Sequence, residues 1–231
     1  MKRPTQLLIP AAGMGTRLQS DRPKALIEIG GVPLLALTLR RFASLGLDSQ
    51  CVVTIPEGYR EEFERCVREF NLGSTVTFVN GGAERQDSVA NGLAALSAAT
   101  EIVVIHDAAR PFVPVTAIEA SIAAAVEFGA ATVAIPAIDT VLVEDGKGFL
   151  LNTPERKTLW SCQTPQTFRV ELIRAAHAAA KAGGVSATDD ATLVQLFGGR
   201  VKLVNGSPLN MKITTPDDMK LALAIVKGEM A

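Results

Sequence analysis

Short apolar runs recur along the chain and alternate with segments whose apolar residues repeat every three or four positions. Six runs have the length of a strand, at residues 6–10, 51–55, 75–80, 102–106, 131–136 and 200–204. Several are almost continuously apolar, which is typical of parallel strands whose two faces are both covered. The alternation of strands and helices predicts an α/β fold with three layers around a mainly parallel sheet.

The last helix has the clearest pattern. Thr215 suits its N-cap, Pro216 its first position, and the two aspartates that follow favour its positive N-terminal end. The apolar residues then follow the spacing of a half-buried helix, at Met219, Ala222, Leu223 and Val226. Pro33 similarly predicts a helix that runs to about residue 45.

The alternation is interrupted at residues 137–159. Two apolar runs, at 141–143 and 149–151, flank an Asp145-Gly146 turn, which predicts a β-hairpin. Because a two-stranded hairpin is marginally stable alone, we expect this arm to pack on something else, such as a second subunit. A plain surface excursion is the alternative. No repeat or linker divides the chain, so we predict one domain over residues 1–231 that carries this arm.

Composition limits the partners. The 23 basic and 24 acidic side chains give a formal net charge of −1, which favours neither a nucleic acid nor a membrane surface as partner. Anion binding must therefore depend on a local cluster of Lys and Arg. We find no secretory leader and no apolar run near the roughly 20 residues that span a bilayer. Three scattered cysteines (Cys51, Cys66, Cys162) indicate free thiols, so we expect a cytoplasmic protein.

The loop after the first strand suits phosphate binding. Its small residues let the backbone approach a ligand closely, at Ala11, Ala12, Gly13 and Gly15. Arg17 and Lys24 add two positive charges just beyond, and Pro23 restricts the chain before Lys24. Loops at the carboxyl ends of parallel strands are where open α/β sheets bind ligands.

Two familiar nucleotide motifs are incomplete in this loop. A dinucleotide fingerprint would require glycine at position 18, which is Leu18, and the Gly-Lys-Ser/Thr of a P-loop is absent. The Gly-x-Gly spacing alone is equally typical of a plain strand-to-helix turn. It is the added Arg17, Pro23 and Lys24 that favour phosphate binding.

Several segments, taken together, resemble a known enzyme family. They are AAGMGTR (11–17) followed by Pro23-Lys24, GGAERQDSV (81–89), HDAARP (106–111), QTPQ (163–166), ATDD (187–190) and NMKIT (210–214). In this order they are similar to the 2-C-methyl-D-erythritol 4-phosphate cytidylyltransferases, nucleotidyltransferases that activate sugar phosphates, over about residues 6–227. The resemblance implies a Rossmann-like sandwich in which the arms join a homodimer.

The resemblance implies a nucleotide site for CTP. Its residues would be Ala11, Ala12, Gly13, Gly15, Arg17, Lys24, Gly82, Ala83, Ser88 and Asp107. Small residues here would hold the cytidine through the main chain. Ala83 departs from the family, because many relatives have Asp there, so any side-chain contact at that position is lost. For Gly81-Gly82, a simple turn before a helix is the alternative.

The resemblance also implies a site for the acceptor phosphate. Its residues would be Asp107, Arg110, Thr140, Arg156, Thr164, Thr188 and Lys212, with Thr140 and Arg156 supplied by the partner's arm. Two of these have structural alternatives, because Thr188 resembles a helix cap and Arg156 could simply be solvated. His106 is expected to be a packed, hydrogen-bonded residue and not a general base.

The implied reaction transfers CMP from CTP to 2-C-methyl-D-erythritol 4-phosphate and releases pyrophosphate. The attacking phosphate oxygen is already anionic, so positioning and charge neutralisation matter more than proton transfer. Arg17 and Lys24 would stabilise the transition state, while Arg156 and Lys212 would position the acceptor phosphate. Mg²⁺, or another divalent cation, would be held mainly by the CTP phosphates, with Asp107 as its candidate protein ligand.

Three other functions remain to be distinguished. A cytidylyltransferase for ribitol 5-phosphate or a related polyol phosphate is the nearest, although its loop typically reads Ala-Gly-Gly. A nucleotide-binding regulator without turnover is a second, and the four retained cations argue against it. A dinucleotide oxidoreductase is the third, and the missing glycine at position 18 disfavours it.

Overall fold

A central mixed sheet organises the chain in this computed structural model, which describes residues 3–72 and 75–229. Within these ranges the sheet has seven strands in the order β11-β7-β10-β6-β1-β4-β5. Their bounds are β1 (Thr5–Pro10), β4 (Cys51–Ile55), β5 (Val76–Asn80), β6 (Ile102–Ile105), β7 (Ala130–Pro136), β10 (Trp160–Arg169) and β11 (Lys202–Asn205). Each predicted run corresponds to one of these strands, so the mainly parallel sheet is confirmed.

Strand β10 is the exception to the parallel arrangement. It pairs antiparallel with both β6 and β7, and its register with β7 shifts between Cys162 and Gln166. The sequence did not predict β10, because a polar stretch interrupts its apolar pattern. Bulges of this kind often lie beside functional sites, where they redirect side chains.

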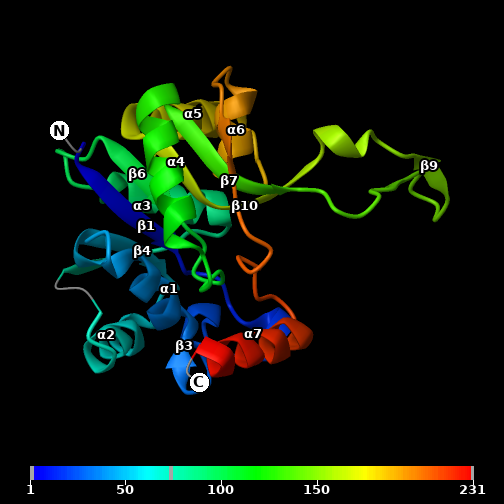
Figure 1. The fold of residues 1–231 in the computed structure, drawn as a ribbon. Coiled ribbons are helices and arrows are strands. Elements are labelled where there is room, and N and C mark those ends of the chain that lie inside the picture. The colour runs from blue at the N-terminus through cyan, green and yellow to red at the C-terminus, as the bar shows by residue number, and fades with distance from the viewer. Residues whose placement is uncertain (1–2, 73–74, 230–231) are drawn as a thin grey trace.

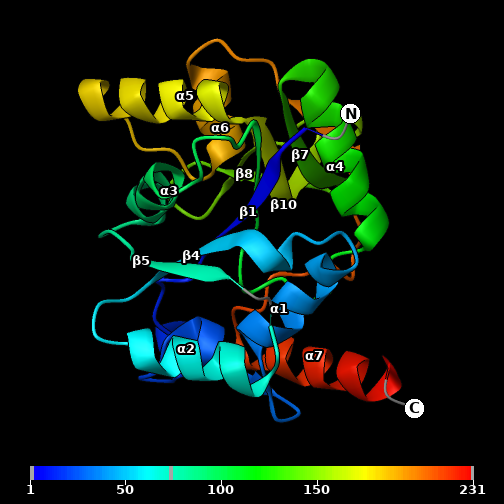
Figure 2. The same cartoon turned by 90° about the vertical axis from the view of Figure 1, so that its left-hand side faces the viewer.

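Helices cover both faces of the sheet, as Figure 2 shows. They are α1 (Leu34–Ala43), α2 (Arg60–Glu69), α3 (Arg85–Ala94), α4 (Val115–Phe128), α5 (Val170–Gly183), α6 (Asp190–Leu196) and α7 (Pro216–Glu229). Side chains alternate across β1, so Leu7 and Ile9 pack in the core formed with α1, α2 and α4. Leu8 lies in the opposite core, with α3, α5 and α6. The three-layer prediction is therefore confirmed.

The C-terminal helix forms a third, smaller core beside the sheet. Ala222 and Val226 of α7 pack with Ile213 and with the hairpin β2 (Glu28–Ile29) and β3 (Val32–Pro33). The Thr215 hydroxyl accepts a hydrogen bond from the Asp218 backbone N–H (3.2 Å), so the predicted cap is confirmed. Pro33, however, ends β3 and lies just before α1, whose last residue is Ala43; that helix is shorter than predicted.

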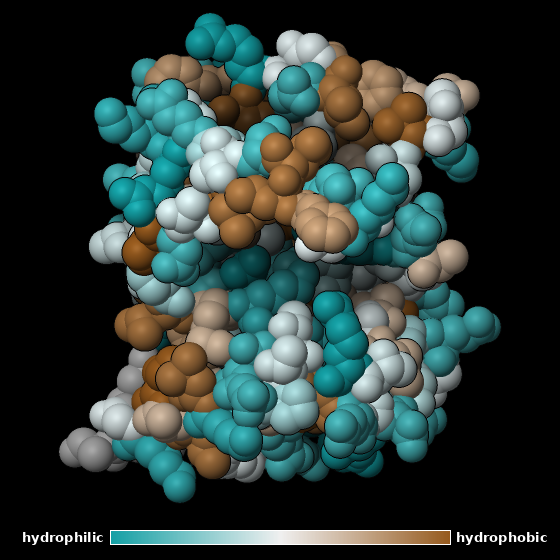
Figure 3. All heavy atoms as spheres, turned by 90° about the vertical axis from the view of Figure 1, so that its right-hand side faces the viewer, coloured by the Kyte–Doolittle hydropathy of each residue, from teal (hydrophilic) through white to brown (hydrophobic). Residues whose placement is uncertain are grey.

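Residues 137–159 extend away from the body, as Figure 1 shows. They contain the predicted hairpin, as β8 (Val143–Glu144) and β9 (Leu150–Asn152), and the 3-10 turn η4 (Arg156–Thr158). Figure 3 views the molecule from the side of the arm, with apolar residues in front of a hollowed, hydrophilic region. Phe149, Leu150 and Leu151 are 72%, 62% and 63% exposed. None of the helices in the described ranges is long and apolar enough to cross a membrane.

Candidate active site

Loops that follow β1, β5 and β6 meet at one edge of the sheet, because these strands are parallel. A cavity of about 290 Å³ lies there. Ten of the predicted residues line it: Ala11, Ala12, Gly13, Arg17, Lys24, Gly82, Ala83, Ser88, Asp107 and Lys212. The structure thus brings the predicted nucleotide residues together, with one exception.

Gly15 is the exception, since it does not line the cavity. It is buried, and a Cβ at this position would come within 2.8 Å of Ile27 Cδ1 and 3.0 Å of the Arg22 carbonyl oxygen. Its backbone N–H donates to that same carbonyl (3.0 Å). Glycine is therefore required here because the loop folds tightly on itself, and the prediction that Gly15 contacts CTP has no support in the geometry.

The loop after β5 is held by Ser88. The Ser88 hydroxyl accepts from the Gly82 backbone N–H (3.1 Å) and donates to the Glu84 carbonyl (3.0 Å). A Cβ on Gly81 would overlap the Cβ of Ala12, so the two loops touch. A capping box formed by Glu84 and Asp87 then starts α3. The glycines accordingly do more than form a turn, because they bring the β5 loop against the β1 loop.

Lys24 and Arg17 both line the larger cavity. Among the described residues, neither side chain has a hydrogen-bond or ion-pair partner. Partial burial, Lys212 and Arg17 lower the pKa of Lys24 to about 8. Positive charges that repel one another in this way favour a polyanionic ligand.

A second cavity of about 160 Å³ adjoins the first. Its lining includes five of the residues predicted for the acceptor: Asp107, Arg110, Thr164, Thr188 and Lys212. Arg85, Asp107 and Lys212 line both cavities, so they form a common wall. Two ligands bound on either side of this wall would be neighbours, which is the arrangement that group transfer requires.

Asp107 is the anionic centre of the wall. Its carboxylate lies 2.8 Å from Lys212 Nζ, 3.2 Å from Arg85 Nε and 4.0 Å from Arg110 Nε. Although burial opposes its charge, Arg85 and Lys212 hold the pKa of Asp107 far below its usual range. The carboxylate therefore remains ionised at neutral pH.

His106 is packed and hydrogen-bonded, as predicted. Its ring nitrogens lie 3.0 Å from the Arg110 carbonyl oxygen and 3.0 Å from the Thr164 hydroxyl, and its edge packs on Phe42. Complete burial lowers its pKa to about 4. A neutral ring with both nitrogens engaged supports the neighbouring Asp107 and Thr164, and it is not placed to act as a base.

Thr140 and Arg156 lie on the arm, and neither lines the cavities of its own chain. Both are exposed, and Arg156 Nη1 donates to the Ile138 carbonyl (3.0 Å) within the arm. Their role in a partner's site stays a prediction. Thr188 is exposed too, but it is Asp189 that caps α6 by accepting from the Thr192 N–H (2.8 Å), so the helix-cap alternative for Thr188 is wrong.

Sequence reasoning missed some residues that the site depends on. Arg85 joins Asp107 to Asp190. The side-chain amide of Asn210 donates to the Thr164 carbonyl (2.8 Å), and its backbone carbonyl accepts from Arg110 Nη1 (2.7 Å). Arg85 lies in the motif at 81–89 and Asn210 in the motif at 210–214, so their position within a motif was the sequence signal that could have identified them. Their partners, however, are far away in the sequence.

Comparisons with known proteins point to one family. The family model described as 2-C-methyl-D-erythritol 4-phosphate cytidylyltransferase matches residues 5–228. Proteins with this name from Bacillus pumilus and Syntrophotalea carbinolica are 42% and 46% identical to the chain. These alignments cover 97% and 95% of this chain, and the same shares of the two relatives.

Solved structures agree. The 2-C-methyl-D-erythritol 4-phosphate cytidylyltransferase of Thermus thermophilus is 36% identical, with a TM-score of 0.80 over 97% of this chain and 99% of that one. The 4-diphosphocytidyl-2C-methyl-D-erythritol synthase of Anaerococcus prevotii is 28% identical, with a TM-score of 0.86 over 98% and 100%.

The Asp107 cluster gives the first testable prediction. Asp107→Asn removes the only negative charge that the three cations share at the wall, and we expect it to lower the free energy of unfolding by about 3 kcal/mol at pH 7. The folded-state pKa of Asp107 is depressed, so its contribution is present above the unfolded pKa of roughly 4 and is lost as the pH falls. The difference between the two proteins should shrink between pH 5 and pH 3 in urea titrations.

Asp217→Asn is the matched control, because Asp217 forms an exposed pair with Lys220. This variant should have nearly wild-type stability at every pH. The role given to Asp107 would be contradicted if the two variants lost equal free energy of unfolding, or if the loss in Asp107→Asn did not change with pH.

Proposed function

Because the chain belongs to the 2-C-methyl-D-erythritol 4-phosphate cytidylyltransferase family, we propose that it transfers CMP from CTP to 2-C-methyl-D-erythritol 4-phosphate. The products are 4-diphosphocytidyl-2-C-methyl-D-erythritol, an isoprenoid precursor of the non-mevalonate route, and pyrophosphate. The observation that carries the proposal is the pair of adjoining cavities, which have a cationic wall in common.

The reaction needs no general base. A phosphate oxygen of the acceptor attacks the α-phosphorus of CTP, the bond from that phosphorus to the bridging oxygen breaks, and pyrophosphate leaves with the electron pair. The attacking oxygen is ionised near neutral pH, since the second pKa of a phosphate monoester is about 6. The protein must therefore bring two anions together and stabilise the added charge.

Lys24 and Arg17 are the proposed transition-state stabilisers. Both line the larger cavity, and neither forms an ion pair with a carboxylate in the described residues. Lys24 is fixed through its backbone, where its N–H donates to the Gly13 carbonyl (3.0 Å). This bond fixes the point from which the side chain extends, so the ammonium stays within reach of the charge that develops at the α-phosphorus.

The acceptor is proposed to occupy the smaller cavity. Lys212 and Arg110 would attract its phosphate, and the Thr164 and Thr188 hydroxyls suit a polyol chain. We further propose that Thr140 and Arg156 of a partner subunit complete this site in a homodimer joined by the arms. The exposed apolar residues of the arm support this assembly, as does the absence of Arg156 from the lining of the two cavities in its own chain.

Magnesium is the proposed divalent cation, and it would neutralise part of the triphosphate charge. No group of three or more His, Cys, Asp and Glu side chains that could hold a metal occurs in the described residues. The phosphates would therefore supply most of its ligands. Asp107 is the proposed protein ligand, a role in which its carboxylate must give up one of its cation partners.

The proposed setting is the cytoplasm. Cys51, Cys66 and Cys162 are all free thiols. Free thiols of this kind are typical of a reducing compartment.

Pyrophosphate release tests the proposed activity. With 2-C-methyl-D-erythritol 4-phosphate and Mg²⁺ present, we expect kcat/KM for CTP to exceed that for ATP, GTP and UTP by a factor of at least about 100. A site that hydrogen-bonds one base leaves its polar groups unpaired when another base binds. Ribitol 5-phosphate is the control acceptor and should react slowly. Turnover of ribitol 5-phosphate alone would overturn the acceptor, and binding of CTP without any turnover would indicate a regulator.

A pH profile tests Lys24. Protonated Lys24 is required, and its pKa in the free protein is about 8. We therefore expect kcat/KM to fall as the pH rises above about 8, by up to tenfold per pH unit. Lys24→Arg stays protonated throughout this range, so it should have lower activity but no decline up to pH 10. A decline that persists in Lys24→Arg would assign this ionisation to another group.

Mixed dimers test the exchange of arms. Lys24→Ala and Arg156→Ala should each be nearly inactive, but refolding an equal mixture should restore roughly a quarter of wild-type activity. Half of the dimers are then mixed, and each mixed dimer has one site free of both changes if Arg156 serves its partner. The control for subunit exchange is the double variant Lys24→Ala/Arg156→Ala, which carries both changes in one chain and is refolded with wild type. Activity that does not recover would place Arg156 in its own subunit's site.

A further inference from the structure

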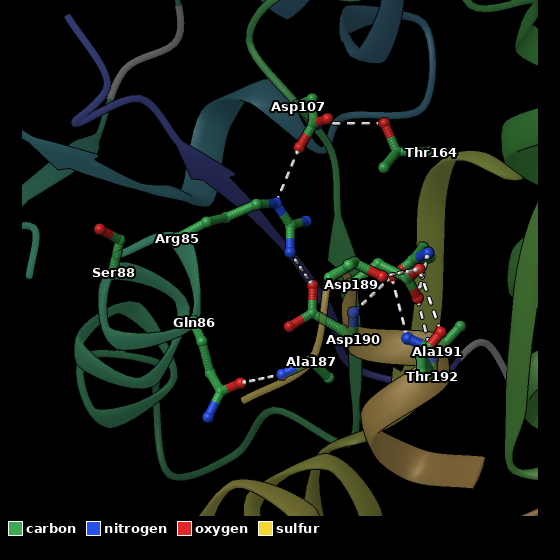
Figure 4. A network of polar contacts seen from close by, with 12 residues as sticks. Arg85, Gln86, Ser88, Asp107, Thr164, Ala187, Asp189, Asp190, Ala191 and Thr192 are labelled. Atoms are coloured by element: carbon green, nitrogen blue, oxygen red, sulfur yellow. Dashed lines mark hydrogen bonds and ion pairs between the residues drawn. The ribbon is translucent and has the colours of Figure 1, made fainter. Parts of the chain in front are cut away.

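Arg85, in the first turn of α3, joins two buried carboxylates from different parts of the fold. Its Nε lies 3.2 Å from Asp107 Oδ1, and its Nη1 lies 2.8 Å from Asp190 Oδ2. Figure 4 shows the guanidinium spanning the space between the end of β6 and the start of α6. Paired with carboxylates on two sides, Arg85 has a strongly restricted conformation.

Asp190 is the fixed end of this connection. Only 2% of its surface is exposed, and its backbone N–H donates to Gln166 Oε1 (3.0 Å). Its Oδ1 lies 3.3 Å from Nε2 of the buried His177, on α5. Asp190 is thereby tied to β10 and α5, so Arg85 transmits a fixed position from the body of the fold to Asp107.

Asp107 and Lys212 are the end of the connection that must change during the reaction. In the free protein, Lys212 Nζ lies 2.8 Å from Asp107 Oδ2. A lysine that grips the acceptor phosphate has to turn from this carboxylate toward the ligand. Once Lys212 turns away, Arg85 is the closer of the two cations left to Asp107, because Arg110 Nε is 4.0 Å away.

We propose that Arg85 is a positioning residue for the acceptor half of the reaction: it fixes Asp107 against Asp190, so that Lys212 can pass from Asp107 to the acceptor phosphate. The inference rests on the proposed function. Arg85 acts through Asp107 and does not need to touch either substrate. Its third nitrogen, Nη2, is buried and has no hydrogen-bond partner among the described residues, a cost that the two ion pairs must offset.

Steady-state kinetics of Arg85→Gln and Arg85→Lys test the proposal. We expect Arg85→Gln to lower kcat and to raise KM for the acceptor, by roughly 10- to 100-fold in kcat/KM, as for other residues that orient a reacting group. KM for CTP should change less than about threefold, because Arg85 bonds to Asp107 and Asp190 and not to the β1 loop that carries Arg17 and Lys24. Arg85→Lys should recover part of the loss, since one ammonium keeps the charge but cannot span both carboxylates. Asp190→Asn should give the same pattern as Arg85→Gln.

Arg174→Gln is the matched control. Arg174 is an exposed arginine on α5 whose Nη2 donates to the Leu93 carbonyl at the end of α3 (2.7 Å), so this bond holds α5 against α3. This variant should lose stability in urea titrations and keep wild-type KM values for both substrates. The double variant Arg85→Gln/Lys212→Gln should be less impaired than the product of the two single effects, because both act on one step.

The outcomes separate this inference from the proposed function. A wild-type protein that does not turn over CTP with 2-C-methyl-D-erythritol 4-phosphate would overturn both. An active wild type with an unchanged acceptor KM in folded Arg85→Gln, or equal changes in both KM values, would overturn the role of Arg85 alone. If Arg85→Gln fails to fold, Arg85→Lys and Asp190→Asn decide the question by the same two KM values.

Discussion

Asp107 carries one negative charge at the end of β6, and cations from three separate parts of the chain meet it. Arg85 comes from α3, Arg110 from the loop that follows β6 itself, and Lys212 from the segment before α7. A buried ion pair stabilises a fold weakly, because desolvation offsets most of the attraction, but it fixes position strongly. The layer of α3, the sheet and the lobe of α7 are therefore tied together at the point where the two cavities meet.

The same cluster explains how a protein of net charge −1 can gather two anionic ligands. The three cations outnumber the two carboxylates that they contact, Asp107 and Asp190, and Lys24 and Arg17 add positive charge on the nucleotide side. Burial is the main cause of the lowered pKa of Lys24, and the positive charges of Lys212 and Arg17 lower it further. Bound phosphates would remove the repulsion among these cations. The energy gained in this way would stabilise the negative charge that develops in the transition state.

Patterns of local sequence predicted the parts of the fold whose causes are local. Continuous apolar runs marked the parallel strands, and Thr215 and Pro216 marked the start of α7. Strand β10 was missed because its buried residues include Gln163 and Gln166, whose partners lie in the loop after β11 and in α6. Arg85 was missed for the same physical reason: its carboxylate partners lie 22 and 105 residues away. Gly15 is the opposite case: the pattern predicts a ligand contact, whereas the tight packing of the loop already accounts for a glycine at this position.

The arm is where one chain is least complete in itself. Its hairpin consists of two short strands, and such a hairpin gains little stability without further packing. Phe149, Leu150 and Leu151 nevertheless face solvent in the isolated chain, although large apolar patches on a protein surface usually mark an interaction site. The arm leaves the body directly after β7 and returns as β10, the strand that carries Thr164. Contact between two arms would therefore act on the strand that lines the acceptor cavity. The proposed dimer would thus help to fix the geometry of the acceptor site in addition to joining two subunits.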